Sequence, residues 1–118
     1  MRKKNLIHDK TYRFALRIVK LYKHLTTNGK EFVLSKQVLR SGTAIGALVR
    51  ESEHAQSKKD FINKMSIALK EAGETDYWLS LLKDSNYICE NSYNSIQKDI
   101  SEILKILISI IKSSKNNM

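Results

Sequence analysis

The 118-residue sequence predicts an all-α protein, folded as an antiparallel up-down-up-down four-helix bundle. The chain has no proline and four glycines, a composition unlike that of turn-rich β proteins. Apolar residues recur at helical spacing in four segments, so each segment has one face that must be buried. Short connections between the segments favour antiparallel packing of sequential helices.

The predicted elements are helices at residues 9–27, 35–54, 57–85 and 94–113, flanked by a flexible basic arm at 1–8 and a frayed tail at 114–118. The first helix is expected to end at Asn28-Gly29, a pair suited to a left-handed turn. Ser35 is the expected N-cap of the second helix. Ser57 and Asp60, three residues apart, begin the third helix in the manner of a capping box.

Each predicted helix contributes an apolar stripe to the core: Phe14, Ile18, Leu21 and Leu25; Val38, Ile45, Leu48 and Val49; Phe61, Met65, Ala68, Leu69, Ala72 and Leu79; Ile96, Ile100, Ile103, Leu104, Leu107, Ile110 and Ile111. The second helix also carries Gly42 and Gly46 on one face. Glycine inside a helix costs about 0.5–1 kcal/mol relative to alanine. These glycines therefore predict a close approach of a neighbouring helix, which offsets that cost.

More apolar residues are present than one bundle needs. A second set lies away from the core stripes of the first and third helices: Tyr12, Leu16, Val19, Ile67, Trp78, Leu81 and Leu82. Apolar residues grouped in this way are typical of an interface. We expect them to form the contact of a homo-oligomer, with a wide single core as the alternative.

Most of the net charge of +9 lies in the first quarter of the chain, since residues 1–30 contain nine Lys or Arg and one Asp. Five basic residues fall within a sector of about 80° on the first helix, at helical spacing: Lys10, Arg13, Arg17, Lys20 and His24. This basic stripe has no acidic residue within it and predicts phosphate contacts that do not read bases. A solvated helix face is the alternative.

A polar cluster is expected between the second and third helices. Arg40 or Arg50 can pair with Glu71 or Glu74, and Glu51 lies on the same helix as the two arginines. Such pairs fix the register of the two helices. An anion or partner site is the alternative.

Catalytic and metal sites are not expected. Glu51-x-x-His54 and Glu71-x-x-Glu74 supply only half of the ligands that a di-metal bundle needs, so no metal or cofactor is predicted. No nucleotide-binding or nucleophile motif is present, which argues against an enzyme. A single cysteine, Cys89, suits the reducing cytoplasm, and no apolar stretch is long enough to span a membrane.

Three segments carry a resemblance to a known family: "RSGTAIGALVRE" at 40–51, "SKKDFINKMSIALKEAGET" at 57–75 and "YWL" at 77–79, with Gln37 before them. Over residues 9–112 the chain resembles the proteins encoded in 23S rRNA intervening sequences. The resemblance implies a left-handed bundle that forms a homopentamer and has no established catalytic activity. A related branch, the accessory proteins of diversity-generating retroelements, works with a reverse transcriptase and nucleic acid.

Together these observations predict a cytoplasmic, non-enzymatic homo-oligomer that binds RNA or DNA through the basic stripe. The resemblance adds a reverse transcriptase as a candidate protein partner. A protein-interaction scaffold without nucleic-acid contact is the alternative function.

Overall fold

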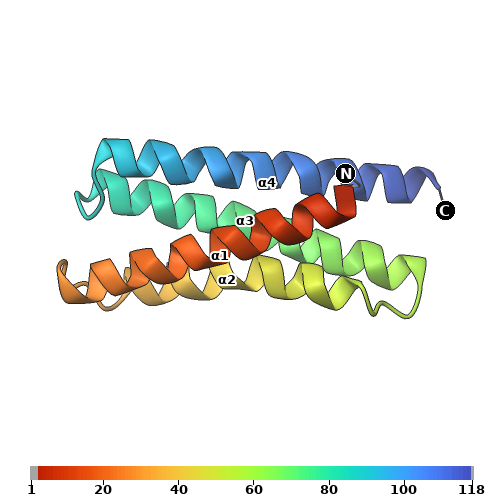
Figure 1. The fold of residues 1–118 in the computed structure, drawn as a ribbon, viewed down its shortest axis with the longest axis horizontal. Helices are drawn as coiled ribbons and strands as arrows, with labels where there is room; N and C mark the ends of the chain where they lie inside the picture. The colour runs from red at the N-terminus through yellow and green to blue at the C-terminus, as the bar shows by residue number, and fades with distance from the viewer. Residues whose placement is uncertain (1–2, 118) are drawn as a thin grey trace.

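The computed structural model describes residues 3–117, which form four α-helices and no strand (Figure 1). The helices are α1 (Lys3–Thr27), α2 (Leu34–Ser52), α3 (Lys58–Asp84) and α4 (Glu90–Asn116). The predicted all-α class is confirmed for these residues. Helices α2 and α4 each pack against both α1 and α3, so the four helices surround one core.

Contacts between sequential helices run in opposite order along the two partners. The backbone at Gly46 of α2 approaches Thr11 of α1, whereas Gly42 approaches Ile18 further along α1. The chain therefore reverses direction between α1 and α2, and Figure 1 shows a return of the chain at each later connection.

Three predicted boundaries were wrong because α1 and α4 are longer than expected. α1 begins at Lys3, so residues 3–8 are helical and not a flexible arm; residues 1 and 2 lie outside the described part. Ile7 explains the extension, because it is fully buried one heptad before Phe14. α4 begins at Glu90, before the predicted start, and it continues to Asn116 through most of the predicted tail.

The cap of α2 also differs from the prediction. Its N-cap is Val33, and Ser35 lies inside the first turn. The Glu31 carboxylate accepts hydrogen bonds from the backbone N–H groups of Val33, Leu34 and Ser35, at 3.2, 2.9 and 2.6 Å. Glu31 thus satisfies the donors that a helix start leaves unpaired, from a position upstream of the helix.

The turn after α1 uses its glycine differently than predicted. The left-handed residue is Lys30, with φ 53°, and Gly29 has an ordinary φ. A Cβ at Gly29 would lie 2.8 Å from the carbonyl oxygen of Leu25. Glycine is needed there for close approach of the backbone, not for a left-handed conformation.

Both ends of α3 follow the sequence-based expectation. Ser57 is the N-cap, and its hydroxyl accepts a 3.0 Å hydrogen bond from the Asp60 N–H. At the other end Asn86 adopts φ 69°, and the Tyr87 N–H donates to the Leu82 carbonyl at 2.8 Å. This arrangement is a Schellman motif, which ends the helix and satisfies its last carbonyl groups.

The core is one continuous apolar cluster. It contains Ile7, Phe14, Ile18, Leu25, Val38, Ile45, Val49, Ile62, Met65, Ala68, Ala72, Leu79, Leu82, Ile88, Ile96, Ile100, Ile103, Leu107, Ile110 and Ile111. Five predicted core residues are only partly buried and pack against this cluster: Leu21, Leu48, Phe61, Leu69 and Leu104. Leu82 was predicted at an oligomer interface, but it is fully buried because it continues the Ala72–Leu79 stripe of α3.

The close approach predicted for Gly42 and Gly46 is present. A Cβ at Gly42 would lie 2.8 Å from Ile18 Cγ1, and a Cβ at Gly46 would lie 3.3 Å from the Thr11 carbonyl oxygen. The glycine face of α2 therefore packs directly on α1, which is the physical reason for two glycines in this helix.

Candidate functional site

The basic stripe of α1 faces outward on the side of α4, where acidic residues of α4 meet it. Lys10 Nζ lies 2.5 Å from Glu102 Oε2, and Arg17 Nη1 lies 2.6 Å from Asp99 Oδ2. Arg17 Nη2 also donates to the Ser95 hydroxyl at 3.0 Å. The Lys10 ammonium lowers the pKa of Glu102. The two helices are thus linked by polar contacts along this edge.

The stripe itself contains no acidic residue, but α4 supplies acidic partners from outside it. Arg13 also has a partner, because its Nε lies 3.2 Å from Asp9 on the preceding turn. Lys20 and His24 are exposed, and neither has a side-chain hydrogen bond or ion pair with any residue that the structure describes. The acids of α4 are separated from the stripe by more than 70 residues of sequence, so only the packing of α4 on α1 brings them there.

The charge surplus remains on this side of the bundle despite these pairs. α1 contains seven Lys or Arg and one acidic residue. α4 contains four Lys and three acidic residues. α2 contains three Lys or Arg and one acidic residue, whereas α3 has five of each. The neighbouring helices α1 and α4 therefore together contain most of the net positive charge of the chain.

A groove lies between α1 and the first turns of α4. Its volume is about 600 Å³, and Lys20 and His24 line it from α1. Tyr87 and Cys89, from the connection between α3 and α4, line the opposite side. The sequence predicts only a loop for this connection, because no local pattern shows that it lies against α1.

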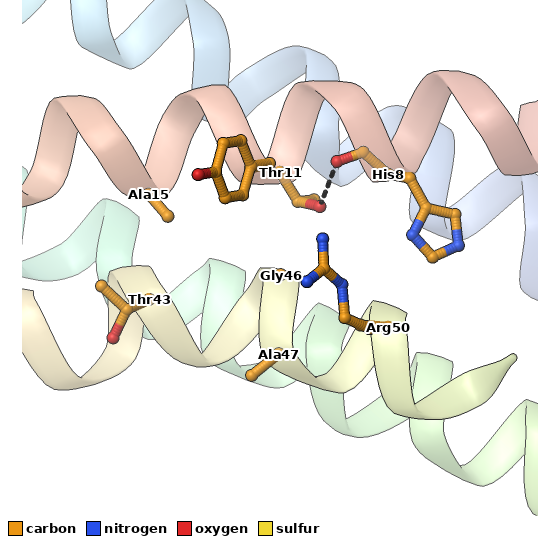
Figure 2. A pocket seen from close by; sticks show the side chains of 8 residues that line it. His8, Thr11, Ala15, Thr43, Gly46, Ala47 and Arg50 are labelled. Atoms are coloured by element: carbon orange, nitrogen blue, oxygen red, sulfur yellow. Dashed lines mark hydrogen bonds between the residues drawn. The ribbon is translucent and has the colours of Figure 1, made fainter. Parts of the chain in front are cut away.

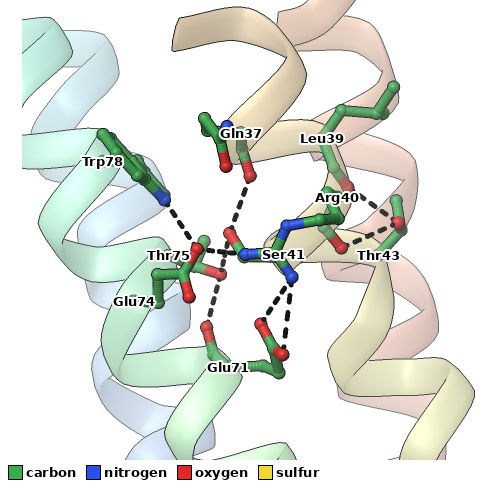
Figure 3. A network of polar contacts seen from close by, with 9 residues as sticks. All are labelled: Gln37, Leu39, Arg40, Ser41, Thr43, Glu71, Glu74, Thr75 and Trp78. Carbon is green, nitrogen blue, oxygen red and sulfur yellow. Dashed lines mark hydrogen bonds and ion pairs between the residues drawn. The ribbon is translucent and has the colours of Figure 1, made fainter.

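The predicted polar cluster is present between α2 and α3 (Figure 3). Arg40 Nη1 lies 3.2 Å from Glu71 Oε1, and Arg40 Nη2 pairs with Glu74. The Trp78 indole N–H donates to Glu74 Oε2 at 2.9 Å, and this bond, together with Arg40, lowers the pKa of Glu74. Arg40 is therefore the arginine that joins α2 to α3 in this cluster.

The other two members of the predicted cluster lie elsewhere. Glu51 pairs with Lys64 of α3 at 3.5 Å, further along the helix pair from Arg40. Arg50 has no ion pair among the described residues and reaches from α2 into a groove beside Thr11 of α1 (Figure 2). The Ser41 and Thr75 hydroxyls, which no sequence pattern connects, lie 2.9 Å apart in the buried centre of the α2–α3 contact.

The predicted interface residues differ in exposure. Tyr12 and Leu16 are 56% and 55% exposed, and Val19 and Ile67 are also exposed. These four side chains remain available to a partner. Trp78 and Leu81 are only partly exposed, and a hydrogen bond to Glu74 holds the Trp78 indole against α3.

Metal ligands do not gather anywhere within residues 3–117. No three His, Cys, Asp or Glu side chains come together in this part of the chain as a metal-binding group. None of its four helices has a stretch long and apolar enough to cross a bilayer.

Comparison with known proteins identifies the family of this bundle. The family model described as 23S rRNA-intervening sequence protein matches residues 3–109. The chain belongs to the 23S rRNA-intervening sequence protein family. No curated protein matches it.

A solved member of the S23 ribosomal protein family has nearly the same fold. It is a protein of unknown function from Bacteroides thetaiotaomicron, with 60% sequence identity to this chain and a TM-score of 0.93. The match covers 94% of this chain and 99% of that one. Family membership and the four-helix fold predicted from the sequence are thus established, whereas the function has to be argued from the surface.

Proposed function

We propose that this member of the 23S rRNA-intervening sequence family is a non-enzymatic, oligomeric RNA- or DNA-binding protein. The observation that carries the proposal is the surplus of positive charge on the neighbouring helices α1 and α4. A local surplus of this size attracts a polyanion, whereas charge needed only for solubility is spread over the surface. Nucleic acid is a polyanion with regularly spaced phosphates.

The ion pairs of the basic stripe are compatible with phosphate binding. Exposed pairs such as Arg13–Asp9 contribute about 0–1 kcal/mol, so a phosphate can compete for the cation. Arg17 donates hydrogen bonds to Asp99 and Ser95, which hold its guanidinium at the border between α1 and α4. Contacts of this kind position a protein on nucleic acid without reading its sequence.

Oligomerisation is the second part of the proposal. Tyr12 lines a groove between α1 and α2 together with the small residues Ala15, Gly46 and Ala47 (Figure 2), and Leu16 is exposed on α1. Exposed apolar side chains next to a shallow groove suit a second copy of the chain. We propose a homo-oligomer, with the pentamer that the family resemblance implies, in which several basic stripes act together.

The test is binding to structured RNA and duplex DNA across a salt series. The variant Arg13→Gln/Arg17→Gln/Lys20→Gln removes three charges from the basic stripe. A matched control, Lys58→Gln/Lys59→Gln/Lys70→Gln, removes three from α3. For the wild type and the control, the logarithm of the binding constant should fall steeply with the logarithm of the salt concentration. In the stripe variant the slope should be smaller by about 0.9 for each duplex phosphate that the protein no longer neutralises.

Two results would contradict the proposal. Equally weakened binding in both variants would show that net charge, not the basic stripe, determines affinity. If an intact oligomer binds neither RNA nor DNA at low salt, nucleic-acid binding is rejected. That result would favour the alternative function, a protein-interaction scaffold.

A further inference from the structure

The groove between α1 and the first turns of α4, beside Lys20 and His24, has two chemically different sides. On the α1 side, Arg17, Lys20 and His24 supply positive charge or hydrogen-bond donors. None of the described residues that line the groove is acidic. Lys20 and His24 have no side-chain partner in the described chain, so their donors are available to an anion.

Apart from Cys89 and Ser92, the rest of the groove is apolar or aromatic. Leu21, Ile88 and Ile96 line it, and Ile88 and Ile96 belong to the buried core. Tyr87 is 39% exposed at the rim. A free inorganic anion would gain nothing from these residues, whereas a ligand with an anionic group and a flat ring would contact both sides.

The size and position of the groove fit one nucleotide. Its volume of about 600 Å³ lies within the range of sites for small organic ligands, about 300–1,000 Å³. Arg17 belongs both to this groove and to the basic stripe, so a strand bound along the stripe would reach the groove. A base paired inside a duplex cannot enter, because its faces are covered by stacking.

We propose that this groove binds one unpaired nucleotide of a single-stranded nucleic acid. The phosphate lies against Lys20 and His24, and the base packs on Tyr87 and the apolar floor. This inference rests on the proposed function and narrows it to single strands. Binding in the groove would give the protein a preference for single strands over duplexes, which phosphate contacts along the stripe do not provide.

The affinity test compares a labelled oligothymidylate of about 20 nucleotides with a duplex of the same length, at one salt concentration. The wild type should bind the single strand at least about tenfold more tightly, and Tyr87→Ala should lose most of that preference. Tyr87→Phe keeps the ring and should retain the preference. Tyr77→Ala, which removes an exposed tyrosine of α3, is the matched control.

Cys89 provides a second readout inside the groove. It is the only cysteine of the chain and is exposed, and hydrogen bonding to the Ser92 hydroxyl and backbone lowers the pKa of its thiol. Alkylation by iodoacetamide, followed by mass spectrometry, should slow when the oligothymidylate is bound. The duplex should protect Cys89 less at equal occupancy.

The outcomes separate this inference from the proposed function. The wild type could instead bind single strand and duplex with equal affinity, with no change in Tyr87→Ala and a loss in the stripe variant. That result would reject nucleotide binding in the groove and support nucleic-acid binding by the basic stripe. Unchanged alkylation of Cys89 under saturating oligothymidylate would also overturn the groove. Absence of binding to either nucleic acid would overturn both.

Discussion

Ile18 of α1 occupies the space that a side chain at Gly42 of α2 would need. A Cβ at Gly42 would lie 2.8 Å from Ile18 Cγ1 and 2.9 Å from Ile18 Cγ2. Ile18 is fully buried, and its β-branched side chain has one strongly preferred rotamer in a helix. The contact between these two residues therefore limits how closely α1 and α2 approach.

Gly42→Ala should destabilise the protein. Overpacking against Ile18 costs about 1–3 kcal/mol, and the better helix propensity of alanine returns only about 0.5–1 kcal/mol. We expect a net loss of about 1 kcal/mol in the free energy of unfolding, measured by urea denaturation. Unchanged or higher stability would show that Ile18 can move aside without cost.

Gly73→Ala is the matched control, because the same substitution is made in another helix with open space around it. Apart from the local backbone of α3, no atom of the described residues lies within 4 Å of a Cβ added at Gly73. Only the difference in helix propensity remains, so this variant should gain about 0.5–1 kcal/mol. A loss at Gly73 would mean that the backbone there is needed for another contact, such as one between subunits.

Glu31 should make stability depend on acidic pH. Burial alone would raise its pKa, but hydrogen bonds from the backbone N–H groups of Leu34, Ser35 and Val33 lower it below the ordinary 4.5. A lowered folded-state pKa stabilises the fold above the unfolded-state value, and this contribution is lost as pH falls through the folded-state value.

Glu31→Ala should therefore cost about 0.5–2 kcal/mol near pH 7, the range for loss of a helix cap. The difference from wild type should shrink as pH falls from the ordinary value of 4.5 toward the lower folded-state pKa of Glu31, where the folded carboxylate becomes protonated. Urea denaturation of both proteins at neutral and acidic pH measures this. A difference that stays constant with pH would exclude the carboxylate as the cap.

The buried hydroxyl pair of Ser41 and Thr75 should behave as a coupled unit. Each hydroxyl also lies near a carbonyl one turn back, Gln37 for Ser41 at 3.1 Å and Glu71 for Thr75 at 2.8 Å. Thr75→Val removes one partner and should cost about 1–2 kcal/mol. Adding Ser41→Ala should cost less than the sum of the two single variants; strict additivity in a double-mutant cycle would show that the pair does not interact.

Leu16→Glu should lower the native mass without unfolding the protomer. Leu16 is 55% exposed on the proposed subunit contact, so a charge there is tolerated in the protomer but not in a closed interface. Ile108→Glu, at a residue of α4 that is 50% exposed, is the matched control and should keep the wild-type mass. Light scattering with circular dichroism distinguishes these outcomes. Loss of mass in the control alone would move the interface to α4.

Local chemistry explains which features could be predicted from sequence. The Ser57 cap and the end of α3 near Asn86 depend on residues within a few positions of each other, and both were located correctly. Helical periodicity identified most of the core for the same reason. The cap of α2 was not predicted because Glu31 lies before the helix. The turn that brings its carboxylate to the first N–H groups of α2 has no recognisable sequence pattern.

The amino-acid sequence alone determined the helical class, the family and a first helix rich in positive charge, because these depend on composition, periodicity and short motifs. Tertiary structure alone decided what surrounds that charge. Packing of α4 on α1 places Asp99 and Glu102 beside Arg17 and Lys10 and leaves Lys20 open at the groove. Charges distant in sequence meet only through the folded core, so their pairing has no local signature.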